Sequence, residues 1–354
     1  MAKAESIYIA GPECFFDNGN EVLKSMRVLA ESHGHTVTLP NDDPLKMDNK
    51  DLRLNAESIF NNLEKVMAET SLIIADLDQF RGAEPDSGTV FEIGMAYARG
   101  IRTYGFARDT RPLVWKDQRL TKTSTAVFDE HGWLHQYTFL PFSPLIMATT
   151  KVVEGTFEDA LVQAELDNYQ LNPSSTATQT LSELTRRPRV FVALMNYYDP
   201  QVQQKARSEL SALQRAGYEL SFPYFEAFDG NETVSVWLNK LLTENQRRVD
   251  EADIFVAELN NLRGYESAND VGFLSGYAFE RGKQLFGFMA DTRPMIEKIP
   301  NTLRDGKYKD IADRDVENFN YPINLMFACS MKISEGGLTE WQQDFLQQTK
   351  AVSE

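Results

Sequence analysis

Acidic residues that could do chemistry follow one apolar run, Leu72–Ala75, in the first half of the chain. They are Asp76, Asp78 and Asp86, with Glu92 six residues further on. Asp86 can cap the helix that it precedes, which is a structural role. Glu92 lies in that helix among nearly all apolar neighbours, and a buried carboxylate is costly unless it has a function or a partner. Glu92 is therefore the residue most in need of a chemical explanation.

Alternating strands and helices are expected to position these carboxyls. The chain contains a repeated unit, described below. In its first copy, strands are expected at 7–10, 36–40 and 72–75, and helices at 20–32 and 88–99. Nearly continuous apolar strands are typical of a parallel sheet covered on both faces, in an α/β protein. Ligands bind such sheets at the carboxyl ends of the strands. The loops expected around one site are therefore Gly11–Gly19, the segment after Pro40 and Asp76–Asp86.

The chain contains an internal duplication. Residues 71–112 align with residues 253–294 at a constant offset of 182, and 16 of the 42 positions are identical. Because this period is too long for a solenoid unit, each copy should be a whole domain. We expect a catalytic domain at 1–170 and a degenerate copy at 188–354, joined by a polar linker at 171–187.

Composition narrows the classes of partner. The 354 residues carry 36 Lys plus Arg and 52 Asp plus Glu, a formal net charge of −16. This balance argues against nucleic acid and anionic membranes as partners, because both bind clustered Lys and Arg. Cys14 and Cys329 are too few for a disulfide framework or a thiolate metal site. No apolar stretch approaches a membrane span and no signal-peptide core follows the N-terminus, so we expect a soluble cytoplasmic protein.

Three linked motifs of the first copy are specific in combination. They are Ile-Tyr-Ile-Ala-Gly-Pro at 7–12, Ala-Asp-Leu-Asp-Gln-Phe-Arg-Gly at 75–82 and Asp-Ser-Gly-x-x-Phe-Glu-Ile-Gly at 86–94. In this order and spacing they resemble the nucleoside 2-deoxyribosyltransferase family, over essentially the whole first copy. The resemblance implies two tandem flavodoxin-like, Rossmann-like domains. Each would have a mostly parallel five-stranded sheet with helices on both faces.

The resemblance also implies a role for each matching side chain. Glu92 matches the nucleophile, which attacks C1′ of a 2′-deoxynucleoside and forms a covalent deoxyribosyl-enzyme that a second base resolves. Tyr8 matches the residue that orients this nucleophile, and Asp86 matches the residue that holds a sugar hydroxyl. Asp76 matches the acid that protonates the leaving base. That role needs a raised pKa, which crowding by Asp78 and Glu92 would supply.

The second copy has lost these groups. Tyr8, Asp76, Asp86 and Glu92 become Phe191, Glu258, Ala268 and Leu274. It keeps Tyr-Pro-Ile-Asn-Leu-Met at 321–326, which resembles the family segment that crosses a subunit interface. There Asn324 would bond the deoxyribose and Met326 would pack near C2′, while Ile146 takes roughly the Asn324 place in the first copy. We expect an intrachain pseudo-dimer with one composite site. The alternative is that the second copy only packs against the first and Asn324 is a turn residue.

Other candidates are weaker. Phe15 and Phe16 lie in the first strand-to-helix loop and are expected to stack on a purine, although aromatic residues are more often plain core. Asn41 and Asp42 follow the second strand and are base contacts by position only. The four histidines lack metal spacing. No metal or organic cofactor is implied, since the leaving base needs only a proton and the oxocarbenium-like centre only a carboxylate.

We expect an enzyme that transfers 2-deoxyribose between nucleobases, with purine deoxynucleosides preferred. Its partners would be 2′-deoxynucleosides and free bases, and family members also form further homo-oligomers. One alternative is an N-glycosidase that uses water, acting on deoxynucleosides or their 5′-monophosphates; the acidic and apolar first loop disfavours a phosphate. A second alternative is a non-catalytic nucleoside-binding module, which the intact set of Tyr8, Asp76, Asp86 and Glu92 argues against.

Overall fold

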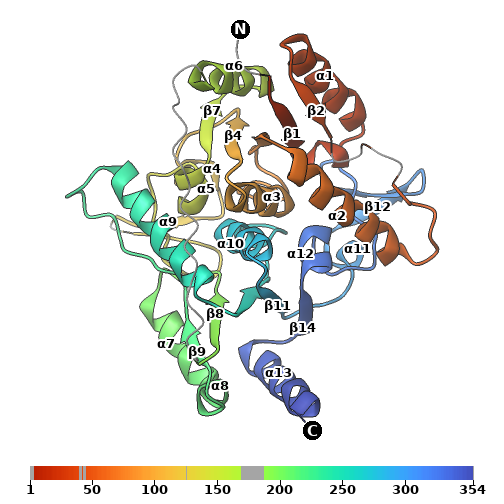
Figure 1. Cartoon of the computed structure of the whole chain (residues 1–354). Helices are drawn as coiled ribbons and strands as arrows, with labels where there is room; N and C mark the ends of the chain where they lie inside the picture. The colour runs from red at the N-terminus through yellow and green to blue at the C-terminus, as the bar shows by residue number, and fades with distance from the viewer. Residues whose placement is uncertain (1–3, 40–41, 43–44, 125, 169–186, 354) are drawn as a thin grey trace.

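The computed structural model describes residues 4–39, 42, 45–124, 126–168 and 187–353. Each half of the chain forms one parallel five-stranded sheet flanked by helices (Figure 1). The expected linker at 171–187 lies outside the described residues except for its last position. Within the described part of the chain, no helix is long and apolar enough to cross a membrane.

The first sheet has the strand order β2-β1-β3-β4-β7, and all neighbouring strands are parallel. Its strands are β1 (Ser6–Ala10), β2 (Thr36–Thr38), β3 (Leu72–Asp76), β4 (Arg102–Ala107) and β7 (Lys151–Glu154). One face is covered by α1 (Gly19–Ser32) and α6 (Phe157–Asn168). The other face is covered by α2 (Leu52–Glu69), α3 (Ser87–Ala98) and α5 (Pro144–Thr149). This is a flavodoxin-like order.

The second sheet repeats this topology, with the order β14-β11-β10-β8-β9 and only parallel neighbours. Its strands are β8 (Arg189–Ala193), β9 (Glu219–Ser221), β10 (Ile254–Glu258), β11 (Gln284–Met289) and β14 (Lys332–Glu335). Its outer face is covered by α7 (Pro200–Glu209), α8 (Ser211–Arg215) and α13 (Leu338–Ser353). Its inner face is covered by α9 (Val234–Asp250), α10 (Asn269–Glu280) and α12 (Leu325–Ser330). The expected fold class is confirmed.

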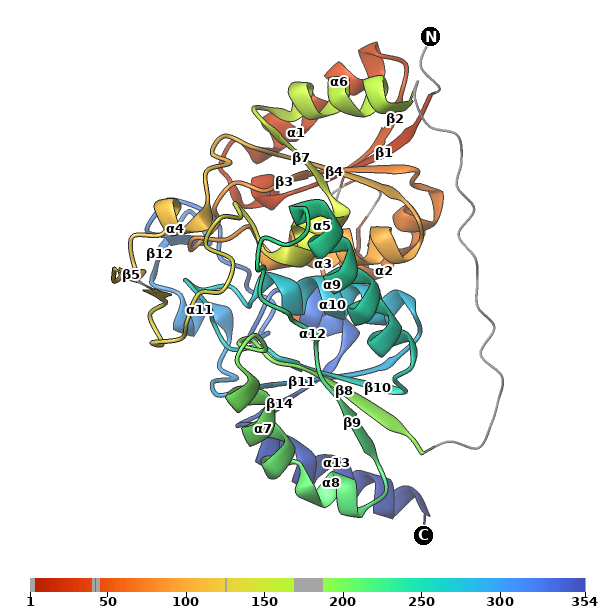
Figure 2. The ribbon, with the colours of Figure 1, turned by 90° about the vertical axis from the view of Figure 1, so that its left-hand side faces the viewer.

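The inner helices of the two copies share one core between the sheets (Figure 2). The crossing of α3 and α10 is the closest part of this contact. A Cβ atom on Gly94 would collide with the backbone carbonyl of Phe273, and one on Gly276 would collide with that of Phe91. Glycine therefore permits the two helices to touch by their backbones. Because the second copy covers the outer side of α3, this helix is buried nearly all round, as its apolar sequence requires.

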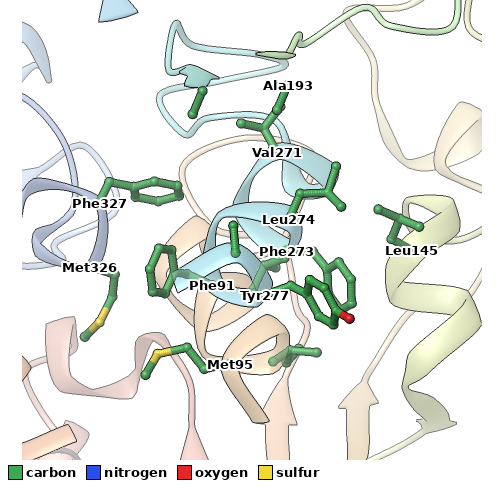
Figure 3. Packing of buried hydrophobic residues seen from close by; sticks show 14 of the residues in the cluster. Phe91, Met95, Leu145, Ala193, Val271, Phe273, Leu274, Tyr277, Met326 and Phe327 are labelled. Atoms are coloured by element: carbon green, nitrogen blue, oxygen red, sulfur yellow. The ribbon is translucent and has the colours of Figure 1, made fainter. Parts of the chain in front are cut away.

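Flanking helices close the shared core on two sides of the α3–α10 pair. Figure 3 shows Leu145 of α5 on one side and Met326 and Phe327 of α12 on the other. Phe91 of α3 packs edge-on against Phe327, with ring centroids 5.4 Å apart. The core therefore joins side chains from both copies, and α12 of the second copy lies against α3 of the first.

Short elements carry chain from each copy towards the other. The first copy has η1 (Pro12–Phe15), α4 (Leu113–Lys116) and the hairpin β5 (Thr121–Lys122) and β6 (Val127–Phe128); the second has α11 (Met295–Lys298) and the hairpin β12 (Asn301–Arg304) and β13 (Lys307–Asp310). The second hairpin reaches the first copy, because Asp310 pairs with Arg81 at 3.3 Å and Lys309 pairs with Asp17. Residues from the second copy therefore stand over the first sheet's strand ends.

Three elements differ in extent from their sequence patterns. The helical stretch at 202–216, the second copy's counterpart of 20–32, is two helices, α7 and α8, because the backbone at Leu210 (φ −86°, ψ 20°) leaves the helical region. The strand expected at 36–40 ends at Thr38, and Pro40 lies outside the described residues. The amphipathic stretch at 338–348 forms the last helix, which continues to Ser353.

Candidate active site

Tyr8 and Glu92 form a buried pair in the first copy. The Tyr8 hydroxyl on β1 donates a hydrogen bond to Glu92 Oε1 on α3 at 2.9 Å. The exposed fractions of the two residues are 1% and 5%. Because β1 and α3 pack against each other in the shared core, both ends of this bond are held by rigid elements. The phenol thus fixes the orientation of the carboxyl.

The protonation of Glu92 follows from this setting. Burial raises the pKa of Glu92 to about 8, and the nearby charge of Asp86 acts in the same direction. The Tyr8 hydrogen bond lowers this pKa because it stabilises the ionised form. Burial and the Glu92 charge raise the pKa of Tyr8 well above its usual range, so the phenol stays a donor. Glu92 can therefore gain or lose a proton close to neutral pH.

A second acidic group lies at the end of β3. Asp76 Oδ1 accepts from the Asp78 amide at 2.7 Å, while Asp78 pairs with Arg108 at 3.0 Å. Burial raises the pKa of Asp76 to about 6. Glu13 lies beside it, and burial and the Asp76 charge raise the pKa of Glu13 well above its usual range. The Asp76–Glu13 pair therefore retains a proton to higher pH than an isolated carboxyl would.

Asp86 has one structural and one free oxygen. Its Oδ2 accepts from the Thr89 amide at 2.7 Å and from the Thr89 hydroxyl at 2.8 Å, which caps α3. Its Oδ1 is buried and has no hydrogen-bond partner. Helix capping therefore accounts for only half of this carboxylate.

One cavity of about 860 Å³ lies between the two copies. Glu92, Asp86 and Phe15 line it from the first copy, and Asn324 and Met326 line it from the second. Strand β13 and the loop that follows it in the second copy contribute much of the remaining wall, with Lys307, Tyr308, Asp315, Val316, Glu317, Asn318 and Phe319. Glu92 and Asn324 thus open onto the same space.

Asn324 is held tightly at this cavity. Its Oδ1 caps α12 by accepting from the Met326 amide at 2.9 Å. Its amide also packs on the first turn of α3, where a Cβ atom on Gly88 would lie 2.5 Å from Asn324 Nδ2. Glycine at position 88 therefore makes room for Asn324. Met326 also lines a small adjoining space beside Tyr8.

The structure does not bring every predicted residue to the cavity. Phe16 is not among its lining residues, although Phe15 is. Asp42 is engaged elsewhere, because it pairs with Arg27 and accepts from the Leu39 amide at 2.8 Å. Tyr8 reaches the cavity only through Glu92. Asp76 lies beside Gly11, which lines the cavity, and neither Asp76 nor Asp78 is among the lining residues. Asn41 lies outside the described residues.

Sequence reasoning missed two acidic residues of the site. Glu13 lies in the first strand-end loop, which was singled out, but its proximity to Asp76 depends on the fold of η1. Glu317 lines the cavity from the segment before Asn324. Following that segment upstream by seven residues from Asn324 would have marked Glu317 as a candidate.

The symmetry-related half of the molecule lacks this site. Phe191 and Leu274 stand in the places of Tyr8 and Glu92, and both are buried. Asp270 replaces Gly88 at the offset of 182 and accepts from the hydroxyls of Tyr197 at 2.8 Å and Tyr198 at 2.9 Å. These buried side chains occupy the place where the first copy keeps its cavity.

The partner helix of this second half corrects one alignment. Helix α5 and strand β7 superpose in order on α12 and β14 at an offset of 181, so the N-cap Ser143 corresponds to the N-cap Asn324. The expected match of Ile146 to Asn324 is therefore wrong, because it was set by a short motif rather than by the helix start. Asp270 Oδ1 accepts from the Leu145 amide at 3.1 Å, as Asn324 Oδ1 does from Met326.

Comparisons with known proteins follow the same division of the chain. The family model described as nucleoside 2-deoxyribosyltransferase matches residues 7–157 and 190–326. A 2-desoxiribosyltransferase from Leishmania mexicana is 30% identical, with a TM-score of 0.36, over 45% of this chain and 95% of its own. A conserved protein from Enterococcus faecalis V583 is 22% identical, with a TM-score of 0.31, and the match covers 47% of this chain and 99% of that protein. No curated protein matches the chain.

Proposed function

Because the chain belongs to the nucleoside 2-deoxyribosyltransferase family, we propose that it transfers 2-deoxyribose between nucleobases through a covalent bond to Glu92. The observation that carries this proposal is the Tyr8–Glu92 pair, which opens onto the same cavity as Asn324 of the other copy. The chain would work as an intrachain pseudo-dimer of domains 1–170 and 188–354 with one composite site.

The first chemical step uses the two acidic groups in different protonation states. The Glu92 carboxylate attacks C1′ while the C1′–N bond breaks and its electron pair leaves with the base. Asp76, with its pKa of about 6 and Glu13 beside it, supports the role of donor of the proton that the leaving base takes up. Tyr8 keeps Glu92 aligned and favours its ionised form.

The second step reverses the first with another base. The incoming base attacks C1′, the C1′–O bond to Glu92 breaks, and the base returns its proton to Asp76. The two inversions give net retention at C1′. No group besides the chain's own carboxyls is needed to balance protons and electrons. Among the residues that the structure describes, no group of three or more His, Cys, Asp or Glu side chains could hold a metal ion.

Residues of the second copy would decide which sugar fits. Asn324 is proposed to bond the deoxyribose, since its amide is buried against Gly88 at the cavity wall. Met326 is proposed to pack near C2′, where a 2′-hydroxyl would lack room. Phe15, stacked on Phe80 with centroids 5.4 Å apart, supports a preference for purines because it offers an ordered ring surface at the cavity.

Base exchange by the whole chain tests this function. 2′-Deoxyinosine is incubated with and without adenine, and hypoxanthine and 2′-deoxyadenosine are measured. A transferase needs adenine for rapid release of hypoxanthine and forms 2′-deoxyadenosine. Equal release without adenine identifies the N-glycosidase instead. A panel of purine and pyrimidine bases, with deoxyribose and ribose donors, measures the proposed preferences.

The covalent step has its own measurement. Intact-mass spectrometry after quenching with a 2′-deoxy-2′-fluoro nucleoside should show one sugar adduct on the wild-type chain and none on Glu92→Gln. An unmodified wild-type chain that still exchanges bases would contradict the covalent route. A chain with neither adduct nor exchange would support the binding module.

A further inference from the structure

Glu317 reaches the cavity on a segment of the second copy that is fastened to the first. The Asp315 amide, two residues earlier, donates to the Phe15 carbonyl at 2.7 Å. The Asp315 carbonyl accepts from Arg81 at 2.5 Å. These bonds fix the backbone beside Glu317, so its side chain is held at the cavity wall together with Asp86.

Carboxylate oxygens here are buried without hydrogen-bond partners. Glu317 Oε2 and Asp86 Oδ1 both lack a partner, and both residues line the cavity. A buried acceptor without a donor is costly, so such a pair in a binding cavity calls for a ligand that supplies donors. The hydroxyl groups of a sugar are donors, whereas an ionised phosphate offers none.

The nearby cations are already engaged. Arg81 contacts Glu266 at 3.8 Å and Asp310 at 3.3 Å besides the Asp315 carbonyl. Lys307 is the one cationic side chain among the described residues that line the cavity, and it pairs with Asp315 at 2.6 Å. Burial and the Asp86 charge raise the pKa of Glu317 to about 8, which shows how strongly this corner resists further negative charge.

The other half of the molecule has no carboxyl at the equivalent position. The two hairpins match at an offset of 181, so Gln136 stands in the place of Glu317. Its neighbour His135 contacts Arg263 at 3.0 Å. Tyr137, on the other side of Gln136, accepts from Arg263 at 3.3 Å. A carboxyl at this position therefore occurs on the side of the molecule that also carries Glu92.

We propose that Glu317 of the second copy is a specificity-determining residue that accepts a hydrogen bond from one free hydroxyl of the deoxyribose, while Asp86 accepts from the other. The site would then select unphosphorylated sugars, because a phosphate in place of that hydroxyl would remove the donor and add charge beside two carboxyls. This inference rests on the proposed function and extends it to the part of the sugar that the second copy recognises.

Substrate analogues test the contact in base-exchange assays. We would measure kcat/KM for 2′-deoxyinosine, its analogues without the 3′- or the 5′-hydroxyl, and its 3′- and 5′-monophosphates. The chains are wild type, Glu317→Leu, Glu317→Gln and the surface control Glu297→Gln. Glu297 is exposed and lies on α11, away from the cavity. Glu317→Met replaces Glu317→Leu if the latter is not folded by thermal unfolding.

In wild type and Glu297→Gln, deletion of the hydroxyl that contacts Glu317 should lower kcat/KM by about 10- to 100-fold, the usual effect of a hydrogen bond to an ionisable group. In Glu317→Leu the same deletion should cost less than about threefold, because no acceptor remains to lose its partner. Glu317→Gln keeps an acceptor oxygen and should keep most of the penalty. The monophosphate at the contacted position should be used at least about 10-fold less well than the nucleoside.

The failures of the two proposals are distinguishable. If wild type exchanges bases but Glu317→Leu shows the full hydroxyl penalty, the role of Glu317 is wrong and the proposed function stands. Equal use of both monophosphates and the nucleoside by wild type also overturns the role of Glu317. If wild type exchanges no bases, the proposed function itself fails.

Discussion

The two halves of this chain share a scaffold and differ in a few side chains at its centre. Tyr8 and Glu92 face each other across β1 and α3, while Phe191 and Leu274 occupy the same positions on β8 and α10. An isologous dimer has two equivalent sites by symmetry, and joining its halves in one chain allows them to diverge. The comparison shows that the fold tolerates both a polar and an apolar pair at this place.

The two halves also differ in how much room they leave beside these side chains. In the first, Gly88 leaves room for Asn324 and a cavity of about 860 Å³. In the second, Asp270 projects from the equivalent turn and binds Tyr197 and Tyr198. Loss of chemistry in the second half is therefore accompanied by polar side chains that satisfy one another. A buried polar network of this kind is stable only when its members are paired.

The largest effect is expected at the nucleophile. Glu92→Gln should lower the base-exchange rate by about 10⁴-fold or more, because the attacking carboxylate is lost. Leu274→Met is the matched change in the other half; it conserves volume and should leave the rate unchanged. Steady-state kinetics with 2′-deoxyinosine and adenine measures both. A similar loss in the two variants would show that the halves are not functionally different.

The next largest effect is expected at Asn324, the N-cap of α12, and not at Ser143, the N-cap of α5. Asn324→Ala should lower kcat/KM by about 10- to 100-fold through loss of a buried hydrogen bond to the sugar. It should also lower stability by about 1 kcal/mol, because Asn324 caps α12. Asn324→Asp keeps the cap and removes the amide donor, so it isolates the catalytic part. Ser143→Ala in the other half is the control, and a rate loss as large as that of Asn324→Ala would contradict the composite site.

Gly88→Ala tests the same contact from the other side. Its Cβ atom would lie 2.5 Å from Asn324 Nδ2, so Asn324 must move while α3 itself gains a better helix former. We expect a loss of kcat/KM of about 10-fold without loss of thermal stability. Asp270→Asn, at the equivalent turn, should not change the rate. Full activity of Gly88→Ala would show that the position of Asn324 is unimportant.

Removal of the phenol should have a smaller effect with a distinct pH signature. The proposed mechanism needs Glu92 ionised and Asp76 protonated, and their pKa values of about 8 and about 6 predict a bell-shaped profile of kcat/KM. Tyr8→Phe removes a donor that lowers the pKa of Glu92. The alkaline limb should therefore move to higher pH and the maximum should fall about 10-fold. An alkaline limb that does not shift would show that Tyr8 does not affect the pKa of Glu92.

The smallest effect is expected from a double substitution that gives the first half the buried pair of the second. Tyr8→Phe with Glu92→Leu reproduces the Phe191–Leu274 pair and should raise stability by about 1–3 kcal/mol at alkaline pH. The folded pKa of Glu92 lies above its unfolded value, so its stabilising contribution is present at acidic pH and is lost as pH rises through about 8. The gain in thermal unfolding temperature should thus be larger at pH 9 than at pH 5. The opposite trend would contradict a raised pKa for Glu92.

Much of the fold was predictable from local patterns. Apolar strands such as Leu72–Ala75 and the offset of 182 residues predicted two parallel sheets, because strand burial on both faces leaves a continuous apolar run. The break between α7 and α8 was not predictable, since it lies within a regular helical pattern. The match of Ser143 to Asn324 needed the starts of α5 and α12, which a short motif does not define.

The candidate site divides in the same way. The types and spacing of Tyr8, Asp86 and Glu92 are properties of the sequence, and they predicted which side chains to examine. Only the tertiary structure brings Asn324 and Glu317 to Glu92, more than 220 positions away in the chain, and only packing buries Glu92 enough to raise its pKa to about 8. The physical reason is that periodicity and composition act on neighbours in sequence. Burial, cavity shape and the pKa of a carboxyl depend on groups that the fold assembles from both halves of the chain.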